Sequence, residues 1–106
     1  MREPLSGEAI RLGRTLAALM PDDSEVLGLL ALELLHDARR RGRVDDAGRL
    51  VPLEEQDPRS WDHERVAEGV EVLRRAMQLT AAPGSYVLQA QVAALHSTAR
   101  TAEDTD

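Results

Sequence analysis

The sequence predicts an all-α domain made of two antiparallel helix hairpins, with a short β-hairpin or loop insert between them. Apolar residues recur at helical spacing in four stretches, and short connectors that contain Pro, Gly or Asp separate the members of each pair. Between the pairs lies the segment 42–61, which holds two prolines and has no helical periodicity. Stacked helix hairpins are the unit of tetratricopeptide-repeat-like (TPR-like) arrays, although the aromatic positions of that repeat are absent here.

The first hairpin is expected over residues 7–20 and 25–41. Ser6 can cap its first helix, in which apolar side chains recur at Ala9, Leu12, Leu16 and Leu19. Asp23 or Ser24 is expected to cap the second helix. That helix is apolar almost all round, at Val26, Leu27, Leu29, Leu30, Leu32, Leu34 and Leu35. Such a helix is buried on most of its faces, so we expect it at the centre of the packing.

The insert, residues 42–61, begins at Gly42, which is a natural stop for the preceding helix. Residues 43–53 contain two short β-prone ends around a turn, and this pattern predicts a small β-hairpin. Pro52 and Pro58 keep helix out of the part of the chain between them. The insert is therefore the one long non-helical segment that the sequence predicts.

The second hairpin is expected over residues 62–80 and 85–99, with Asp62 as the cap of its first helix. One face of that helix carries Val66, Val70, Leu73 and Met77, and one face of the next carries Leu88, Val92, Leu95 and Ala99. The outer faces of such an array stay partly apolar, so dimerisation or further helices are expected to cover them. The acidic stretch 101–106 resembles a linker, which predicts that the chain is a fragment of a longer protein.

Composition argues against several classes of function. The net charge is −6, which disfavours binding of nucleic acid or anionic lipid by this chain. The chain has no Cys, so it forms no disulfide and no thiolate zinc site. No apolar run approaches the roughly 20 residues that a bilayer requires, and we expect a cytoplasmic protein without membrane contact. Arg occupies all 13 Lys or Arg positions, a bias that suggests a GC-rich, actinobacterial genome.

The candidates for metal or acid–base chemistry are incomplete. Glu33 and His36 have the E-x-x-H spacing of di-iron bundles, which require two such motifs and two further carboxylates. The His36-Asp37 pair is similar to the dyad of metal-dependent phosphohydrolases, but no His precedes it. His63 and His96 suggest no common site. We therefore predict no catalytic residue, metal or cofactor, and keep a small-ligand sensor or an enzyme near His36 and Asp37 as the alternative.

Two polar groups remain as candidates for binding. Arg39, Arg40, Arg41 and Arg43 form a basic cluster that suits an anion, RNA or an acidic partner. We favour a structural role, in which they offset the helix dipole and pair with acids of the insert, namely Asp45, Asp46, Glu54 and Glu55. For Gln56, Asp57 and Trp61 the structural reading is a capped turn with Trp61 packed beneath the hairpin. The functional reading is a recognition surface, and the two readings are compatible.

Several runs closely resemble the C-terminal extension of a group of bacterial extracytoplasmic-function sigma factors. The runs are EAIRLGR (8–14), LLAL (29–32), LLHDARR (34–40), DAGRLV (46–51), LEEQD (53–57) and LQA (88–90). HDARR followed by a D-x-G-R-L turn and a Gln-Asp pair is the specific part. In that family an Arg follows Gln-Asp, with a Trp shortly after. Here Pro58 takes the place of the Arg, Arg59 comes next and Trp61 is retained, so the role of that Arg is in doubt.

The resemblance implies that residues 1–106 are a single TPR-like domain of a sigma factor whose regions 2 and 4 are absent here. It implies a regulatory or protein-interaction role in transcription initiation. The implied partners are the sigma regions of the parent chain, the RNA polymerase core or a regulatory protein, with a homodimer of the fragment as a further option. No direct nucleic-acid contact by this fragment is implied. The motif residues, with an interaction or structural role, are His36, Asp37, Arg39, Arg40, Gln56, Asp57 and Trp61.

Overall fold

The computed structural model describes residues 2–40, 47–57 and 61–105, and over these ranges the chain is helical apart from its connections. The helices are α1 (Arg2–Leu19), α2 (Ser24–Ala38), α3 (His63–Gln78) and α4 (Ser85–Thr105), with a 3₁₀ helix, η2 (Leu53–Glu55), between α2 and α3. The all-α prediction is confirmed. None of the described helices is long and apolar enough to span a membrane.

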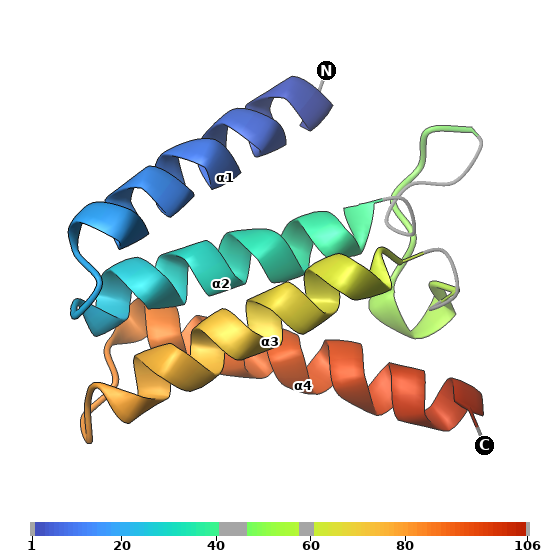
Figure 1. Cartoon of the computed structure of the whole chain (residues 1–106). Coiled ribbons are helices and arrows are strands. Elements are labelled where there is room, and N and C mark those ends of the chain that lie inside the picture. The colour runs from blue at the N-terminus through green and yellow to red at the C-terminus, as the bar shows by residue number, and fades with distance from the viewer. Residues whose placement is uncertain (1, 41–46, 58–60, 106) are drawn as a thin grey trace.

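α2 is the central helix of the array. It packs against α1 on one side and against both α3 and α4 on the other, as Figure 1 shows. Among the described helices, α1 comes into close backbone contact with α2 alone. Most of the buried side chains of α2 are leucines, and Leu27, Leu34 and Leu35 are fully inaccessible to solvent. The central position predicted for this nearly all-apolar helix is therefore confirmed.

The α2–α4 contact depends on the absence of a side chain at Gly28. A methyl group at that position would lie 2.8 Å from the amide nitrogen of Val87 and 2.7 Å from its Cγ2 atom. Contacts that short are repulsive, so α4 approaches α2 this closely only because residue 28 is glycine. Val87 and Ala90 on the facing side of α4 are fully buried.

Local capping signals explain where α2 and α3 begin. Asp23 Oδ1 accepts hydrogen bonds from the amides of Glu25 (3.0 Å) and Val26 (3.1 Å). Asp62 Oδ1 accepts one from the amide of Arg65 (3.0 Å). Both caps were predicted, because a short acid immediately before an apolar-periodic stretch satisfies the free N–H groups of the first turn.

Three predicted helix boundaries are wrong. The last helix, α4, continues to Thr105 instead of ending near residue 99, so residues 101–105 are helical and not the expected linker. Ser6 does not cap α1, which begins at Arg2, so that Ser6 lies inside the helix. Pro4 fits there because the amides of a first helical turn have no partner within the helix. α2 ends at Ala38 rather than at residue 41. The carbonyl of Ala38 accepts a hydrogen bond from the Asp62 amide at 2.8 Å, so the returning chain is fixed to the end of α2.

The start of α4 is capped by a residue of another helix. The Glu25 carboxylate accepts hydrogen bonds from the amides of Gly84 (3.1 Å), Tyr86 (2.8 Å) and Val87 (3.4 Å). An anion is favourable at this position, where unpaired N–H groups and the positive end of the helix dipole coincide. The first turn of α2 therefore fixes the first turn of α4.

The predicted β-hairpin over 43–53 is not supported. Its second half, residues 47–53, contains a turn, an isolated β-bridge position at Leu50 and the start of η2, but no strand. Gly48 has φ of +84°, which agrees with the predicted turn. Residues 43–46, like Gly42, lie outside the described part of the chain. Leu50 is 83% exposed, so its side chain does not pack against the core.

The apolar stripes predicted for α1 and α4 point outward. In α1, Leu12 and Leu19 are 61% and 73% exposed, whereas the face turned towards α2 carries Ile10 and Gly13. In α4, Leu88, Val92 and Leu95 are at least half exposed, and smaller residues such as Ala90 are buried. The expectation that the outer faces stay partly apolar is confirmed for the described side chains.

Candidate functional site

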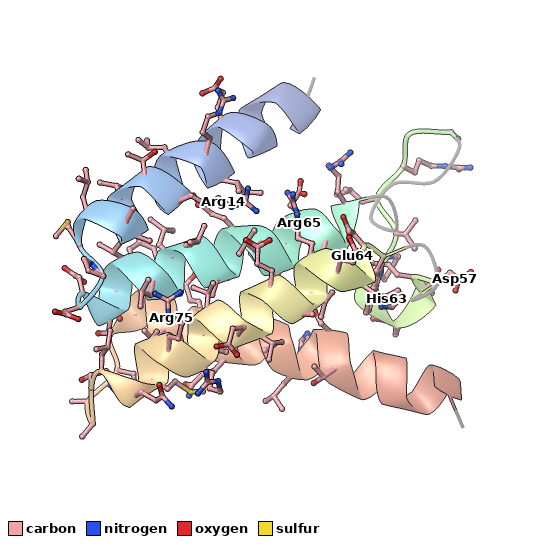
Figure 2. The ribbon with its side chains drawn as sticks, viewed as in Figure 1. Arg14, Asp57, His63, Glu64, Arg65 and Arg75 are labelled. Carbon is pink, nitrogen blue, oxygen red and sulfur yellow. The ribbon has the colours of Figure 1, made fainter. Side chains whose placement is uncertain are left out.

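The clearest polar cluster lies at the end of α2 and is centred on Asp37. Its Oδ1 accepts a hydrogen bond from Arg40 Nε (3.1 Å) and its Oδ2 accepts one from Arg65 Nη1 (3.0 Å). The Asp37 side chain is only 11% exposed. Arg65 belongs to the first turn of α3 and reaches towards α2, as Figure 2 shows. Two guanidinium groups thus neutralise Asp37, which suits a structural anchor better than an acid–base catalyst.

Arg39 and Trp61 form a second anchor next to the first. The Arg39 guanidinium lies 5.7 Å from the centre of the Trp61 ring, in cation–π geometry, and Trp61 is 3% exposed. Trp61 is therefore buried against the end of α2, whereas the sequence suggested a position beneath a β-hairpin that the structure does not support. Together with the Asp37 cluster it ties α2, the end of the insert and α3 to one another.

The Gln-Asp pair divides between an inward and an outward residue. Gln56 is 7% exposed, and its Nε2 donates a hydrogen bond to the carbonyl of Val51 at 3.0 Å. Asp57 is exposed and lies at the outer side of the insert (Figure 2). Of Gln56, Asp57 and Trp61, only Asp57 is exposed on the surface. Pro58 and Arg59, where the sequence departs from the family pattern, lie outside the described residues.

The His36 side chain lines a cleft between α2 and α4. The cleft has a volume of about 350 Å³ and is lined by Leu32, His36, Arg39, Gln89, Val92, Ala93 and His96. The sequence suggested no common site for His63 and His96, and the structure places His96 in this cleft with His36. No local spacing relates residues 36 and 96. Only the packing of α4 on α2 brings them to one place.

Glu33 and His36 do not act together, despite their E-x-x-H spacing. Glu33 faces α1, where a methyl group on Gly13 would come within 2.9 Å of its Oε1 atom, whereas His36 faces α4. Burial raises the pKa of the Glu33 carboxyl above its ordinary value. In residues 2–40, 47–57 and 61–105, no three His, Asp or Glu side chains are grouped so as to hold a metal ion.

Only Arg39 and Arg40 of the predicted basic cluster lie within the described residues. Arg40, just beyond the end of α2, pairs with Asp37, and the Arg39 guanidinium lies over the Trp61 ring. The acids that the sequence offered as partners include Asp45 and Asp46, which lie outside the described residues, as do Arg41 and Arg43. Arg65 was missed as a partner, because 28 positions separate it from Asp37 and no helical spacing links them.

A second, apolar feature lies on the far side of the array. α3 and α4 enclose a groove of about 680 Å³, lined by Val70, Leu73, Arg74, Met77, Leu88, Gln91, Val92, Ala94, Leu95 and Thr98. The stripes that the sequence predicted for these two helices meet in this groove. Arg74, at its edge, donates from Nε to Glu71 at 3.0 Å, and this bond lowers the pKa of the Glu71 carboxyl.

Comparison with known proteins places the chain in a family. Residues 1–77 match the family of unknown function DUF6596. The chain is also 44% identical, over 102 residues, to an uncharacterized protein of Rhizobium meliloti (strain 1021). That match covers 96% of this chain and 24% of the relative, so the chain spans about a quarter of the relative's length. No solved structure matches. Because the family match covers well over half of its residues, the chain belongs to the DUF6596 family.

Proposed function

We propose that this chain is a regulatory, protein-interaction domain of an extracytoplasmic-function RNA polymerase sigma factor, and that it acts in the cytoplasm during transcription initiation. The motifs that resemble such sigma factors, HDARR and Gln-Asp followed by Trp, support this proposal. The observation that carries it is their convergence. Asp37 and Arg39 at the end of α2 contact Arg65 of α3 and Trp61 at the end of the insert, and Gln56 is buried in a bond to Val51 within the insert.

The arrangement supports contact rather than catalysis. Asp37 is occupied by two arginines, and Trp61 and Gln56 are buried, so these residues shape a surface instead of offering reactive groups. Asp57 stands exposed on that surface. An ordered scaffold that presents an exposed acid suits recognition of a basic group on a partner protein.

Charge favours one kind of partner. With a net charge of −6, the domain is complementary to basic protein surfaces and repelled by nucleic acid. Sigma regions that bind promoter DNA need a basic surface to neutralise phosphates. We therefore rank the sigma regions of the parent protein first among the partners, ahead of the polymerase core and a separate regulatory protein.

The test is a binding measurement with the purified chain. The chain is immobilised, and sigma region 2, sigma region 4 and core RNA polymerase are each passed over it at low and at high salt. We expect binding to at least one of them, weakened by salt because exposed charges are screened. Absence of binding to all three at low salt contradicts the proposal. Duplex DNA serves as the negative control.

A small-ligand sensor is the second candidate, and the cleft beside His36 favours it. Two imidazoles, a guanidinium and the Gln89 amide line that cleft of about 350 Å³. A ligand that binds only the folded state raises the melting temperature with its concentration. A panel of metabolites and metal ions therefore tests this reading, with His36→Ala and His96→Ala as matched variants. A rise that both variants abolish supports a ligand site, and a flat panel counts against it.

A further inference from the structure

Little apolar burial holds helix α1 on the array. In residues 7–19, whose side chains the structure describes, Ile10 is the one large apolar residue that is buried. By contrast, α3 buries three large apolar side chains, Val66, Val72 and Leu73. α3 and α4 contact each other as well as α2, whereas α1 comes into close backbone contact with α2 alone among the described helices. A helix held in this way can open at a lower free energy than the whole domain unfolds.

The close approach of α1 to α2 covers part of an acidic side chain. A methyl group on Gly13 would lie 3.2 Å from Leu30 Cδ1 and 2.9 Å from Glu33 Oε1. Glu33 Oε1 is inaccessible to solvent and has no hydrogen-bond partner within the described part of the chain. The docked α1 therefore covers a carboxylate oxygen without offering it a donor.

Covering this oxygen costs free energy when the Glu33 carboxyl is ionised. Water solvates the carboxylate once α1 has moved away, whereas in the docked state the buried oxygen has neither water nor a donor. The same burial raises the pKa of Glu33. Protonation therefore favours the docked helix, and ionisation favours its opening as the pH rises through the raised pKa.

The charged side chains on this side of the array are engaged with one another. Arg14 of α1 donates to Glu68 of α3 at 2.8 Å, in a pair whose side chains are both exposed by at least 40%. Arg65 of α3 donates to Asp37 of α2 at 3.0 Å. α4 packs on the other side of α2 from α1, as Figure 1 shows. The Arg14–Glu68 pair thus joins α1 to α3 through water-exposed groups, and burial decides the direction in which the pKa of Glu33 moves.

We propose that α1 is a strap that opens from α2 while the rest of the array stays folded, and that the Glu33 carboxylate beneath it sets how often it opens. Burial of Ile10, the close fit at Gly13 and the Arg14–Glu68 pair hold the strap closed. Opening returns Glu33 to water and uncovers the side of α2 that carries Leu30. This inference does not depend on the proposed function, because it involves no partner.

Hydrogen exchange under native conditions, measured in rising urea, tests whether α1 opens separately. The amides of residues 13–19 in α1 are compared with those of residues 28–35 in α2. At neutral pH the α1 amides are expected to be less protected, and their protection is expected to depend less on urea, because local opening exposes less surface than unfolding. Equal protection and equal urea dependence in both helices overturn the proposal, since α1 then opens only when the whole domain unfolds.

Two variants test the role of Glu33. Glu33→Gln cannot ionise and is expected to raise the protection of the α1 amides several-fold at neutral pH. Asp37→Asn weakens the contact between α2 and α3, which stays intact when α1 opens, so it is expected to lower protection in α2 and leave α1 unchanged. Glu54→Gln, the same change as in Glu33→Gln but at an exposed site of the insert, is expected to leave α1 unchanged as well.

The proposal is overturned if Glu33→Gln leaves the α1 amides as they are in wild type. It is also overturned if Asp37→Asn lowers protection in α1 as much as in α2, because the two helices then open together. Glu33→Met provides a second variant that cannot ionise, and it too is expected to slow exchange in α1. Circular dichroism checks that each variant is folded.

Discussion

Asp37 Oδ2 and Arg65 Nη1 lie 3.0 Å apart and join the end of α2 to the first turn of α3 across 28 positions of sequence. The Asp37 side chain is 11% exposed and the Arg65 side chain 28%, so water screens this pair only partly. Arg40 occupies the other carboxylate oxygen of Asp37. Asp37 therefore accepts hydrogen bonds from Arg40 of the same HDARR run and from Arg65 of α3, and these two contacts give it a structural role.

Replacing Asp37 by Asn is expected to destabilise the domain. The change removes the negative charge from a pair of charge-assisted hydrogen bonds, each of the kind worth about 1.5–3 kcal/mol. We expect the free energy of unfolding to fall by about 2 kcal/mol in urea titrations. The matched control is Glu68→Gln, which removes the negative charge from the carboxylate that accepts from Arg14 at 2.8 Å, in a pair whose side chains are 48% and 40% exposed. That loss is expected to stay below about 1 kcal/mol, and equal losses for the two variants contradict the anchoring role of Asp37.

Replacing Glu25 by Ala is expected to weaken the start of α4. Three amides of that turn lose their acceptor, and loss of an N-terminal cap costs about 0.5–2 kcal/mol. Glu25→Gln keeps one acceptor oxygen and removes the charge, so its loss should be smaller. Hydrogen exchange at Tyr86 and Val87 is the measurement, and both amides are expected to exchange faster in Glu25→Ala. Unchanged exchange there contradicts the capping role.

Adding one methyl group at two different glycines is expected to have opposite effects. Gly28→Ala forces a Cβ against the backbone of Val87, so stability should fall by about 1–3 kcal/mol, as for other overpacked positions. Gly7→Ala lies within α1, with no described atom within 4 Å of the added group. It should raise stability by up to about 1 kcal/mol through helix propensity. Thermal unfolding of both variants is the measurement, and a stable Gly28→Ala contradicts the close α2–α4 approach.

Glu33→Gln is expected to stabilise the protein at neutral pH. Burial raises the pKa of Glu33 in the folded state, so the folded protein binds this proton more tightly than the unfolded chain. This contribution to stability is present below the ordinary pKa of 4.5 and is lost as the pH rises through the folded-state pKa. Gln cannot ionise, so the variant should match wild type in acid and exceed it at neutral pH. Urea titrations at both pH values test this, and a less stable variant at neutral pH means that the carboxylate has a favourable partner.

Signals local in sequence predicted much of the fold. The apolar surface of α2 predicted its central position in the fold. The caps at Asp23 and Asp62 could be predicted because a capping side chain bonds amides within three residues of itself. Periodicity located the stripes of α1 and α4 but did not say which face is buried. Both helices have an apolar face of large residues and one that includes small residues, and here the small residues allow close packing on α2.

Contacts distant in sequence were beyond prediction. The bonds from Arg65 to Asp37 and from the α4 amides to Glu25 follow no spacing rule, and the meeting of His36 with His96 depends on how α4 packs. The expected hairpin is not supported by the described residues, for a related reason. β propensity reflects a half-buried pleated surface, and Leu50, at 83% exposed, is not buried on such a surface. The motif residues of the insert were identified by resemblance, but their inward or outward direction was not.

Removing the charge of Asp57 most directly tests whether the insert, which is held against the end of α2, presents a contact surface. Asp57→Asn and Asp22→Asn make the same change at exposed sites, one in the insert and one in the connection between α1 and α2. The measurement is the affinity of each variant for the sigma regions and for core RNA polymerase, alongside its free energy of unfolding. We expect Asp57→Asn to weaken binding about tenfold, as for a lost charge-assisted contact of about 1.4 kcal/mol, while the domain stays folded and Asp22→Asn binds like wild type. Equal affinities for both variants and wild type contradict the contact surface.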